Sequence, residues 1–454
     1  MIDWLGGRLG RWDAWLKRSV NRRIFAALLT IGGLTVVVKL ASTAKELVVA
    51  HQFGTGDALD AFLIAFLLPS FTIQMVAGTF RLALIPTYVQ IREQEGQDAT
   101  QRLFSSAMVL GTASLAAISA LLALLAPYVL PIMASGFGPE KLALTSSLFY
   151  LFLPALVISG LSTIWKAILN AGERFALVAL APIMIPVVAV AVLLVMGGVW
   201  GIYALAVGTV IGFVLEAGLL ALSLKRRKFS LLPRWYGMYP AMRKVINQCP
   251  PLLATYVFMG SAVFVDQAMA AVLGSGSVST LNYANRVVGP LLEVGGLALG
   301  TAVLPHLSRM SAADDWRGVR HTLKTYTRLI LLTTVPLTLI LVYFSEPLVG
   351  LLFQRGAFTA EDTHLVAQVQ AALLLQLPFY MLSTLLVQLV YSTHSNRALM
   401  VSAIISLLLD VLLNYALMQY FGVVGIALST VFVYIGTLVF LLVMYRRVVR
   451  FTAE

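Results

Sequence analysis

The chain has 454 residues, of which 59% are hydrophobic and 11% are charged, and its formal net charge is +12. Soluble domains carry about 25% charged residues, so a soluble protein of this length would lack the polar surface that covers its core. The composition therefore predicts an integral membrane protein. The basic excess does not indicate nucleic-acid binding, because Lys and Arg lie in short gaps between apolar stretches. The single cysteine, Cys249, excludes a disulfide framework and a cysteine-based metal site.

The first 23 residues contain no apolar run that resembles a signal peptide. Apolar residues recur there at helical spacing, with basic residues between them: Trp4, Leu5, Leu9, Trp12, Trp15 and Leu16. This pattern predicts an amphipathic helix over 1–23 that lies in the membrane interface. A frayed basic tail is the alternative.

Apolar stretches follow that are long enough for helices crossing about 30 Å of hydrocarbon in roughly 20 residues. They lie at 24–50, 58–90, 103–133, 143–169, 175–197, 199–224, 247–273, 278–306, 322–344, 362–391, 398–419 and 423–445. Because a chain segment in lipid must satisfy its own backbone hydrogen bonds, we expect an all-α fold of twelve transmembrane helices.

The gaps between these stretches carry most of their positive charge on one side. Alternate gaps and both termini hold most Lys and Arg residues, whereas the opposite gaps hold only Lys141 and Arg355. Loops rich in Lys and Arg usually remain on the cytoplasmic side of the membrane. Both termini and the basic gaps are therefore predicted to be cytoplasmic.

The second half of the chain repeats landmarks of the first. "FGTG" from Phe53 corresponds to "LGSG" from Leu273, and "GIYAL" from Gly201 corresponds to "GIALS" from Gly425. Six spans in each half predict a parallel repeat of two pseudo-symmetric lobes, an arrangement typical of transporters. The predicted parts are the interfacial helix 1–23, the N-lobe 24–224, a basic linker 225–246, the C-lobe 247–447 and a tail 448–454.

Five basic residues fall at membrane depth, where a charge costs at least about 2.5–3.5 kcal/mol and normally faces a cavity or a partner. They are Lys39, Lys45, Arg81, Lys166 and Arg286.

Several of these cations share a helix face with other polar residues. Lys39, Ser42 and Glu46 are spaced i, i+3 and i+7, with Lys45 beside Glu46. Asn282 and Arg286 are spaced i, i+4. Lys39, Lys45 and Arg286 together suit a pyrophosphate, which Arg binds with two donors and Lys as a point charge. Structural pairs of Lys45 with Glu46, and of Arg286 with the nearby Glu293, are the alternative.

Oxygen-bearing side chains form a second group. Asp266 lies in the seventh span, Asp410 and Asn414 are spaced i, i+4 in the eleventh, and Thr430 lies in the twelfth. Such ligands suit a small hard cation, and they equally suit hydrogen bonds between helices.

Catalytic motifs are missing from the sequence. It contains no Walker A sequence and no GxSxG, HExxH or CxxC pattern. We therefore expect a transporter rather than an enzyme, with no required cofactor and no use of ATP.

The segments "GTGDALDAFLIAFLLPSF", "ALIPTYV" and "GLLFQRGAFTAEDT" resemble the MurJ (MviN) family of lipid II flippases, part of the multidrug, oligosaccharidyl-lipid and polysaccharide exporter superfamily. The resemblance runs from about residue 39 to about residue 447. It implies two six-helix lobes around a central cavity. It also implies alternating access, which moves an undecaprenyl-pyrophosphate-linked oligosaccharide across the bacterial inner membrane.

The resemblance assigns roles to individual residues. It implies substrate-binding roles for Lys39, Lys45, Glu46, Asp60 and Arg286. It also implies a sodium site, formed by Asp266, Asp410, Asn414, Thr430 and the carbonyl of Ile426.

The second span departs from the family pattern. Ile73, Gln74 and Ala77 stand where an arginine pair and a glutamate are usual, and Arg81 follows one turn later as a weaker candidate for the substrate site. A lipid II-like precursor is the expected substrate, and an exopolysaccharide unit on the same carrier is the main alternative. A drug/cation antiporter, a membrane enzyme of cell-wall assembly and a scaffold that recruits a polymerase are further alternatives. Proteins of cell-envelope glycan synthesis are the expected protein partners.

Overall fold

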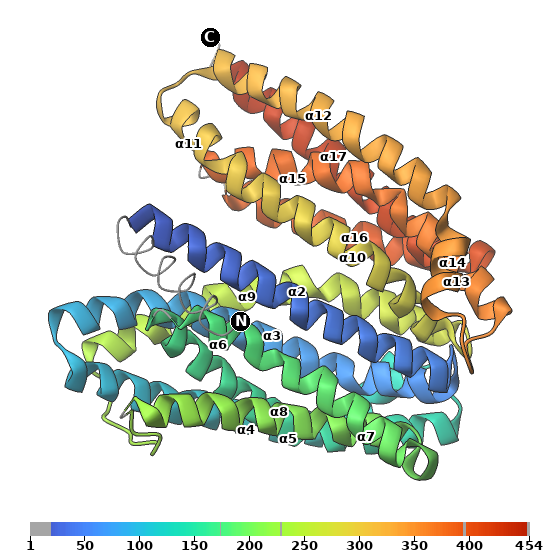
Figure 1. The fold of residues 1–454 in the computed structure, drawn as a ribbon. Helices are drawn as coiled ribbons and strands as arrows, with labels where there is room; N and C mark the ends of the chain where they lie inside the picture. Colours follow the sequence, from blue (N-terminus) through green and yellow to red (C-terminus); the bar gives the residue numbers. More distant parts are fainter. Residues whose placement is uncertain (1–19, 173, 228, 394–395, 452–454) are drawn as a thin grey trace, which may run out of the picture. The chain divides into compact units, whose positions relative to one another are not determined.

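The computed structural model describes residues 20–172, 174–227, 229–393 and 396–451 (Figure 1). Within these ranges every regular element is a helix and no strand occurs, which confirms the all-α prediction. The predicted interfacial helix 1–23 falls mostly on residues outside the described ranges.

Long helices dominate the first half of the chain. They are α2 (Val20–Phe53), α3 (Asp57–Gln94), α4 (Gln97–Met133), α5 (Pro139–Ala171), α6 (Phe175–Leu180), the 3₁₀ turn η1 (Ala181–Ile183), α7 (Met184–Trp200) and α8 (Ile202–Arg226). The helix α3 continues through Pro69 and Pro86. Pro182 lies in η1, where a missing amide hydrogen is tolerated at the start of the next helix.

The second half contains shorter helices as well. They are α9 (Pro240–Val272), α10 (Ser277–Ala302), α11 (Leu304–Ala312), α12 (Trp316–Tyr343), α13 (Ser345–Phe353), α14 (Ala360–Leu374), α15 (Gln376–Ser392), α16 (Asn396–Phe421) and α17 (Val423–Phe451). The helix α14 begins with a capping box, in which Thr359 and Asp362 satisfy each other's backbone amides.

Ten stretches among the described residues are long and apolar enough to cross a membrane. They correspond to ten of the twelve expected spans. The other two, 24–50 and 247–273, lie in the long helices α2 and α9, where part of each span falls outside the residues whose side chains are described; within the described part of α9, Gly260–Val272 is apolar. The number of twelve spans and the two six-helix lobes stay predictions.

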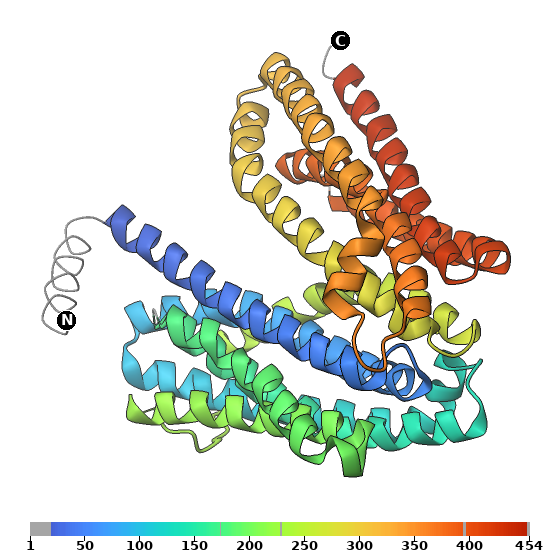
Figure 2. The same cartoon turned by 45° about the vertical axis from the view of Figure 1, so that its right-hand side comes forward.

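The chain divides into two compact units. Unit 1 contains residues up to Val48 together with Leu68–Leu125 and Ser147–Ala254, and unit 2 contains Val49–Leu67, Ala126–Ser146 and residues from Thr255 onward. Unit 2 thus includes the start of α3 and the end of α4 with the start of α5. In unit 1, α7 and α8 pack along their length, and in unit 2 α16 and α17 do the same (Figure 2).

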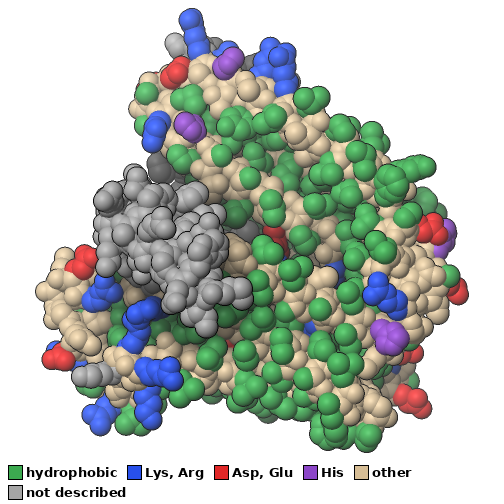
Figure 3. Space-filling model, viewed as in Figure 1, with side chains coloured by type: hydrophobic (Ala, Val, Ile, Leu, Met, Phe, Trp, Pro, Cys, Tyr) green, Lys and Arg blue, Asp and Glu red, His purple; other side chains and the backbone are tan. Residues whose placement is uncertain are grey.

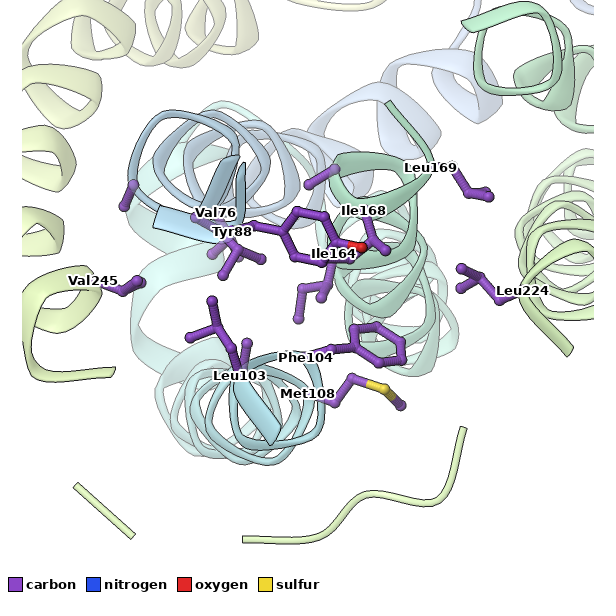
Figure 4. Packing of buried hydrophobic residues seen from close by; sticks show 14 of the residues in the cluster. Val76, Tyr88, Leu103, Phe104, Met108, Ile164, Ile168, Leu169, Leu224 and Val245 are labelled. Atoms are coloured by element: carbon purple, nitrogen blue, oxygen red, sulfur yellow. The ribbon is translucent and has the colours of Figure 1, made fainter. Parts of the chain in front are cut away.

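Each unit has its own apolar core. In unit 1, Tyr88 from α3 lies beside Ile164 and Ile168 from α5, with Leu103 and Phe104 of α4 below them (Figure 4). In unit 2 a second cluster joins α10, α12 and α15, and the rings of Tyr283, Phe353 and Phe358 contact one another in tilted and edge-to-face arrangements. Figure 3 shows Lys and Arg side chains gathered at the left-hand end of the helices coloured blue to green in Figure 1.

Candidate functional site

A fully buried carboxylate in unit 2 anchors the start of α10. Asp60, in the first turn of α3, has 0% of its surface exposed. Its Oδ2 accepts a hydrogen bond from the backbone amide of Gly276 at 2.8 Å, and its Oδ1 accepts one from that of Ser279 at 2.8 Å. These amides lie at the N-terminus of α10, where helical amides lack partners and the helix dipole favours negative charge. Asp60 therefore caps α10 from another helix.

Lys141, in the first turn of α5, completes this arrangement. Its Nζ lies 2.8 Å from Asp60 Oδ2 and 2.6 Å from Asp57 Oδ1, and 3.9 Å from the centre of the Phe137 ring. The Lys141 side chain is 10% exposed, whereas that of Asp57 is 61% exposed. We call Asp57, Asp60, Lys141 and the two amides of α10 the Asp60 cluster. It joins the first turns of α3, α5 and α10.

The family-like segments "FGTG" and "FQRGAFT" contact each other beside this cluster. The amide of Ala357 donates to the His51 carbonyl at 2.8 Å, and Thr55 Oγ1 donates to Asp362. Gly54 has φ +56°, and a Cβ at this position would collide with the Ala357 carbonyl. Only glycine fits here, because it tolerates both the left-handed backbone and the close approach.

The predicted basic face of α2 lies in unit 1. Lys39 is exposed, Ser42 and Lys45 are half-buried, and Glu46 is buried. Lys45 Nζ lies 2.9 Å from Glu46 Oε1, so the expected alternative of an ion pair is present. Ser42 donates its hydroxyl to the Val38 carbonyl one turn earlier.

The other predicted substrate residues lie on α10 and α3. On α10 in unit 2, Arg286 is exposed and Asn282 is half-buried. Arg81 belongs to α3, but its side chain lies outside the part of the chain whose side chains are described. The convergence of these residues with Lys39 and Lys45 on one site stays a prediction.

The oxygen-bearing residues form a hydrogen-bonded network between three helices of unit 2. The Nδ2 of Asn414 in α16 donates to Asp266 Oδ1 in α9 at 2.8 Å. Ser429 in α17, which the sequence interpretation missed, donates to the Asn414 Oδ1. Asp410 lies one turn before Asn414 and is 3% exposed. Its Oδ2 has no hydrogen-bond partner among the described residues.

Oxygen atoms predominate in this network. The Ile426 carbonyl accepts hydrogen bonds from Ser429 at 2.7 Å and Thr430 at 3.2 Å, and Ser429 links this turn of α17 to Asn414. The described residues contain no group of three or more His, Cys, Asp and Glu side chains arranged for a metal. The two carboxylates, of which Asp410 has one oxygen without a partner among the described residues, and the neutral oxygens are ligand types that suit a hard cation better than a soft one.

A buried ion pair in unit 1 was not predicted. Lys166 Nζ in α5 lies 2.7 Å from Glu216 Oε1 in α8, and the Glu216 side chain is 1% exposed. The sequence placed Lys166 at membrane depth, and the same reasoning applied to Glu216 would have suggested the pair.

The fold is shared with solved transporters. A structure titled "Lipid II flippase MurJ, inward closed conformation" aligns with a TM-score of 0.78 at 21% identity, covering 92% of this chain and 87% of that one. An inward-facing multidrug resistance MATE family transporter of the MOP superfamily aligns with a TM-score of 0.74 at 12% identity, covering 92% of this chain and 94% of that one.

Similar sequences have the same family name. The lipid II flippase MurJ of Burkholderia cenocepacia is 29% identical over 415 residues, covering 89% of this chain and 80% of that protein. The probable lipid II flippase MurJ of Rickettsia prowazekii is 24% identical over 411 residues, covering 90% of this chain and 81% of that protein. The family model described as "Lipid II flippase MurJ" matches residues 49–454. This match spans most of the chain, which therefore belongs to the lipid II flippase MurJ family.

Proposed function

We propose that this protein is a flippase for an undecaprenyl-pyrophosphate-linked oligosaccharide, lipid II or a close relative, in the bacterial inner membrane. It works by alternating access, and both of its termini face the cytoplasm. The match of the family model to residues 49–454 carries this proposal. The ten apolar helices support a location in the membrane.

The cations of α2 and α10 are the proposed pyrophosphate site. Lys39, Lys45 and Arg286 neutralise the diphosphate, because charge-assisted hydrogen bonds to phosphate are roughly twice as strong as neutral ones. Glu46 holds the Lys45 ammonium at 2.9 Å and competes with an incoming diphosphate for it. Ser42, Asn282 and Arg81 are secondary candidates.

The Asp60 cluster is the proposed gate on the outer face. The topology prediction places Lys141 on the side opposite to the basic gaps. In the described arrangement the first turns of α3, α5 and α10 are held together, which suits a state closed at this end. Opening requires that Asp60 release α10.

An exopolysaccharide repeat unit on the same lipid carrier is the second candidate substrate. The apolar Ile73 and the neutral Gln74 favour it, because they stand in the span where an arginine pair is usual in lipid II flippases.

The substrate is tested by complementation of a bacterial strain depleted of its own lipid II flippase. We expect this protein to restore growth, and a Lys39→Ala/Lys45→Ala variant made in equal amount to fail. No growth despite normal membrane levels would contradict lipid II transport. Loss of an exopolysaccharide after deletion of the native gene would then favour the second candidate.

The proposed cation is sodium, held by Asp266, Asp410, Asn414, Thr430 and the Ile426 carbonyl. Its transport with the substrate cycle would supply a driving force, because one charge moved across 100 mV is worth about 2.3 kcal/mol.

We expect sodium chloride to raise the unfolding temperature of the purified protein above its value in choline chloride of equal ionic strength. A ligand at one hundred times its dissociation constant stabilises the folded state by about 2.7 kcal/mol. Asp410→Asn is expected to abolish the difference between the two salts. The matched control Glu346→Gln alters an exposed carboxylate of the same unit. It is expected to retain the difference in unfolding temperature between the two salts. Equal unfolding temperatures in both salts would contradict a sodium site.

A further inference from the structure

Two neighbouring cavities lie in unit 1 where α5 and α8 end. The first has a volume of about 330 Å³ and is lined by Arg92, Arg227, Tyr88 and Leu224 among others. The second has a volume of about 380 Å³ and is lined by Arg174, Arg226 and Arg227 with Leu219 and Leu222. Arg227 lines both cavities, and four arginines line the two cavities together. None of the described residues that line the cavities is acidic.

The end of α5 holds Arg92 in place and lies close to Arg227. Arg92 Nη1 donates to the Ala171 carbonyl at 2.9 Å, which satisfies one of the carbonyls left open at the helix C-terminus. A Cβ on Gly172 would lie 3.7 Å from Arg227 Nη1, so this guanidinium lies close to the same turn. A guanidinium has five N–H donors, and one such contact leaves others for a ligand.

The first cavity has an apolar wall beside its charges. Tyr88, Ile168, Leu169 and Leu224 line it and also belong to the core of unit 1 (Figure 4). Gln97 and Thr100 add neutral hydrogen-bonding groups. Cations, an amide and a hydroxyl next to an apolar wall match a molecule with a phosphate head and an acyl chain.

The cavities lie at the ends of two candidate membrane spans, so we expect them at the level of lipid head groups. The stretches Pro139–Ala171 and Ile202–Arg226 are both long and apolar enough to span the membrane, and the arginines occur at or just beyond their ends. Basic pockets between transmembrane helices at this level bind anionic head groups.

We propose that these two cavities bind the phosphodiester head group of an anionic phospholipid. Arg92 and Arg227 hold the phosphate in the first cavity, while Arg174 and Arg226 extend the positive region into the second. The lipid bridges the ends of α3, α5 and α8. This site is separate from the basic face of α2, and it does not depend on which glycan the protein carries.

The test is a binding titration of the purified full-length protein in uncharged detergent with short-chain phosphatidylglycerol, read by native mass spectrometry. Short-chain phosphatidylcholine and inorganic phosphate are the comparison ligands. We expect phosphatidylglycerol to bind at least tenfold more tightly than either, and Arg92→Gln/Arg227→Gln to lose at least tenfold in affinity. The matched control Arg243→Gln removes an exposed arginine of the same unit that lines neither cavity and is expected to bind normally.

Three results would overturn the proposal. The double variant could bind as tightly as the unchanged protein, Arg243→Gln could lose as much affinity, or inorganic phosphate could bind as well as the lipid. Because Arg92 caps α5, its loss can also impair folding. Arg174→Gln/Arg226→Gln, which leaves that cap intact, is therefore a second variant and is expected to weaken binding at least threefold.

Discussion

Replacement of Asp60 by Asn is expected to lower the free energy of unfolding by about 3 kcal/mol and to abolish flipping. Breaking a buried ion pair costs roughly 3–5 kcal/mol, because the remaining charge has no partner. We expect the lower end of this range, since Lys141 keeps its contact with Asp57. The new amide also presents hydrogens toward either the Lys141 ammonium or an amide of α10, so one hydrogen bond at the start of α10 is lost.

The measurement is denaturant-induced unfolding in detergent, combined with complementation of the depleted strain. Asp57→Asn is the matched control: Asp57 contacts the same ammonium, at 2.6 Å, but is 61% exposed. Exposed ion pairs contribute about 0–1 kcal/mol to the free energy of unfolding, so this variant is expected to remain stable and active. Equal destabilisation by both substitutions would show that burial of Asp60 does not determine its contribution.

Removal of any one of Lys39, Lys45 and Arg286 is expected to weaken substrate binding ten- to a hundredfold. A hydrogen bond to a charged group contributes about 1.5–3 kcal/mol, and each tenfold change in affinity corresponds to 1.4 kcal/mol. Binding of a polyprenyl diphosphate by the purified alanine variants would measure this effect, and complementation would report on transport.

Arginine at Lys39 or Lys45 keeps the charge and adds a second donor, so Lys39→Arg and Lys45→Arg are expected to remain active. Lys244→Ala is the control for net charge, since Lys244 is exposed and bonds to Gln90 in unit 1. Full binding by all three alanine variants would mean that the pyrophosphate site lies elsewhere.

The fold class followed from the sequence, because the apolar stretches and their basic gaps report directly on membrane insertion. Ten stretches among the described residues are long and apolar enough to span a membrane, and they coincide with ten of the expected spans. Helical spacing placed Lys39 and Glu46 on one face of α2, but spacing does not say which neighbouring helix covers that face.

Sequence patterns did not predict contacts between residues that are far apart in the chain. Asp60 was identified by resemblance alone, and its partners lie 81 residues away at Lys141 and 216 residues away at Gly276. Lys141 had one sequence signal, because it is one of two basic residues in the gaps predicted to face outward. The adjacent pair Lys45 and Glu46 was foreseen because its residues are neighbours in the chain.

The Asp60 cluster also bears on how conformations interconvert. The first turns of three helices meet at the buried Asp60 carboxylate. A small separation of these helices would leave its negative charge without hydrogen-bond donors and without water. Half-open geometries are thereby disfavoured, and the protein should behave as a bistable switch rather than a gradually widening channel. Fluorescence distances between α3 and α10 in single molecules should then jump between two values and rarely dwell between them.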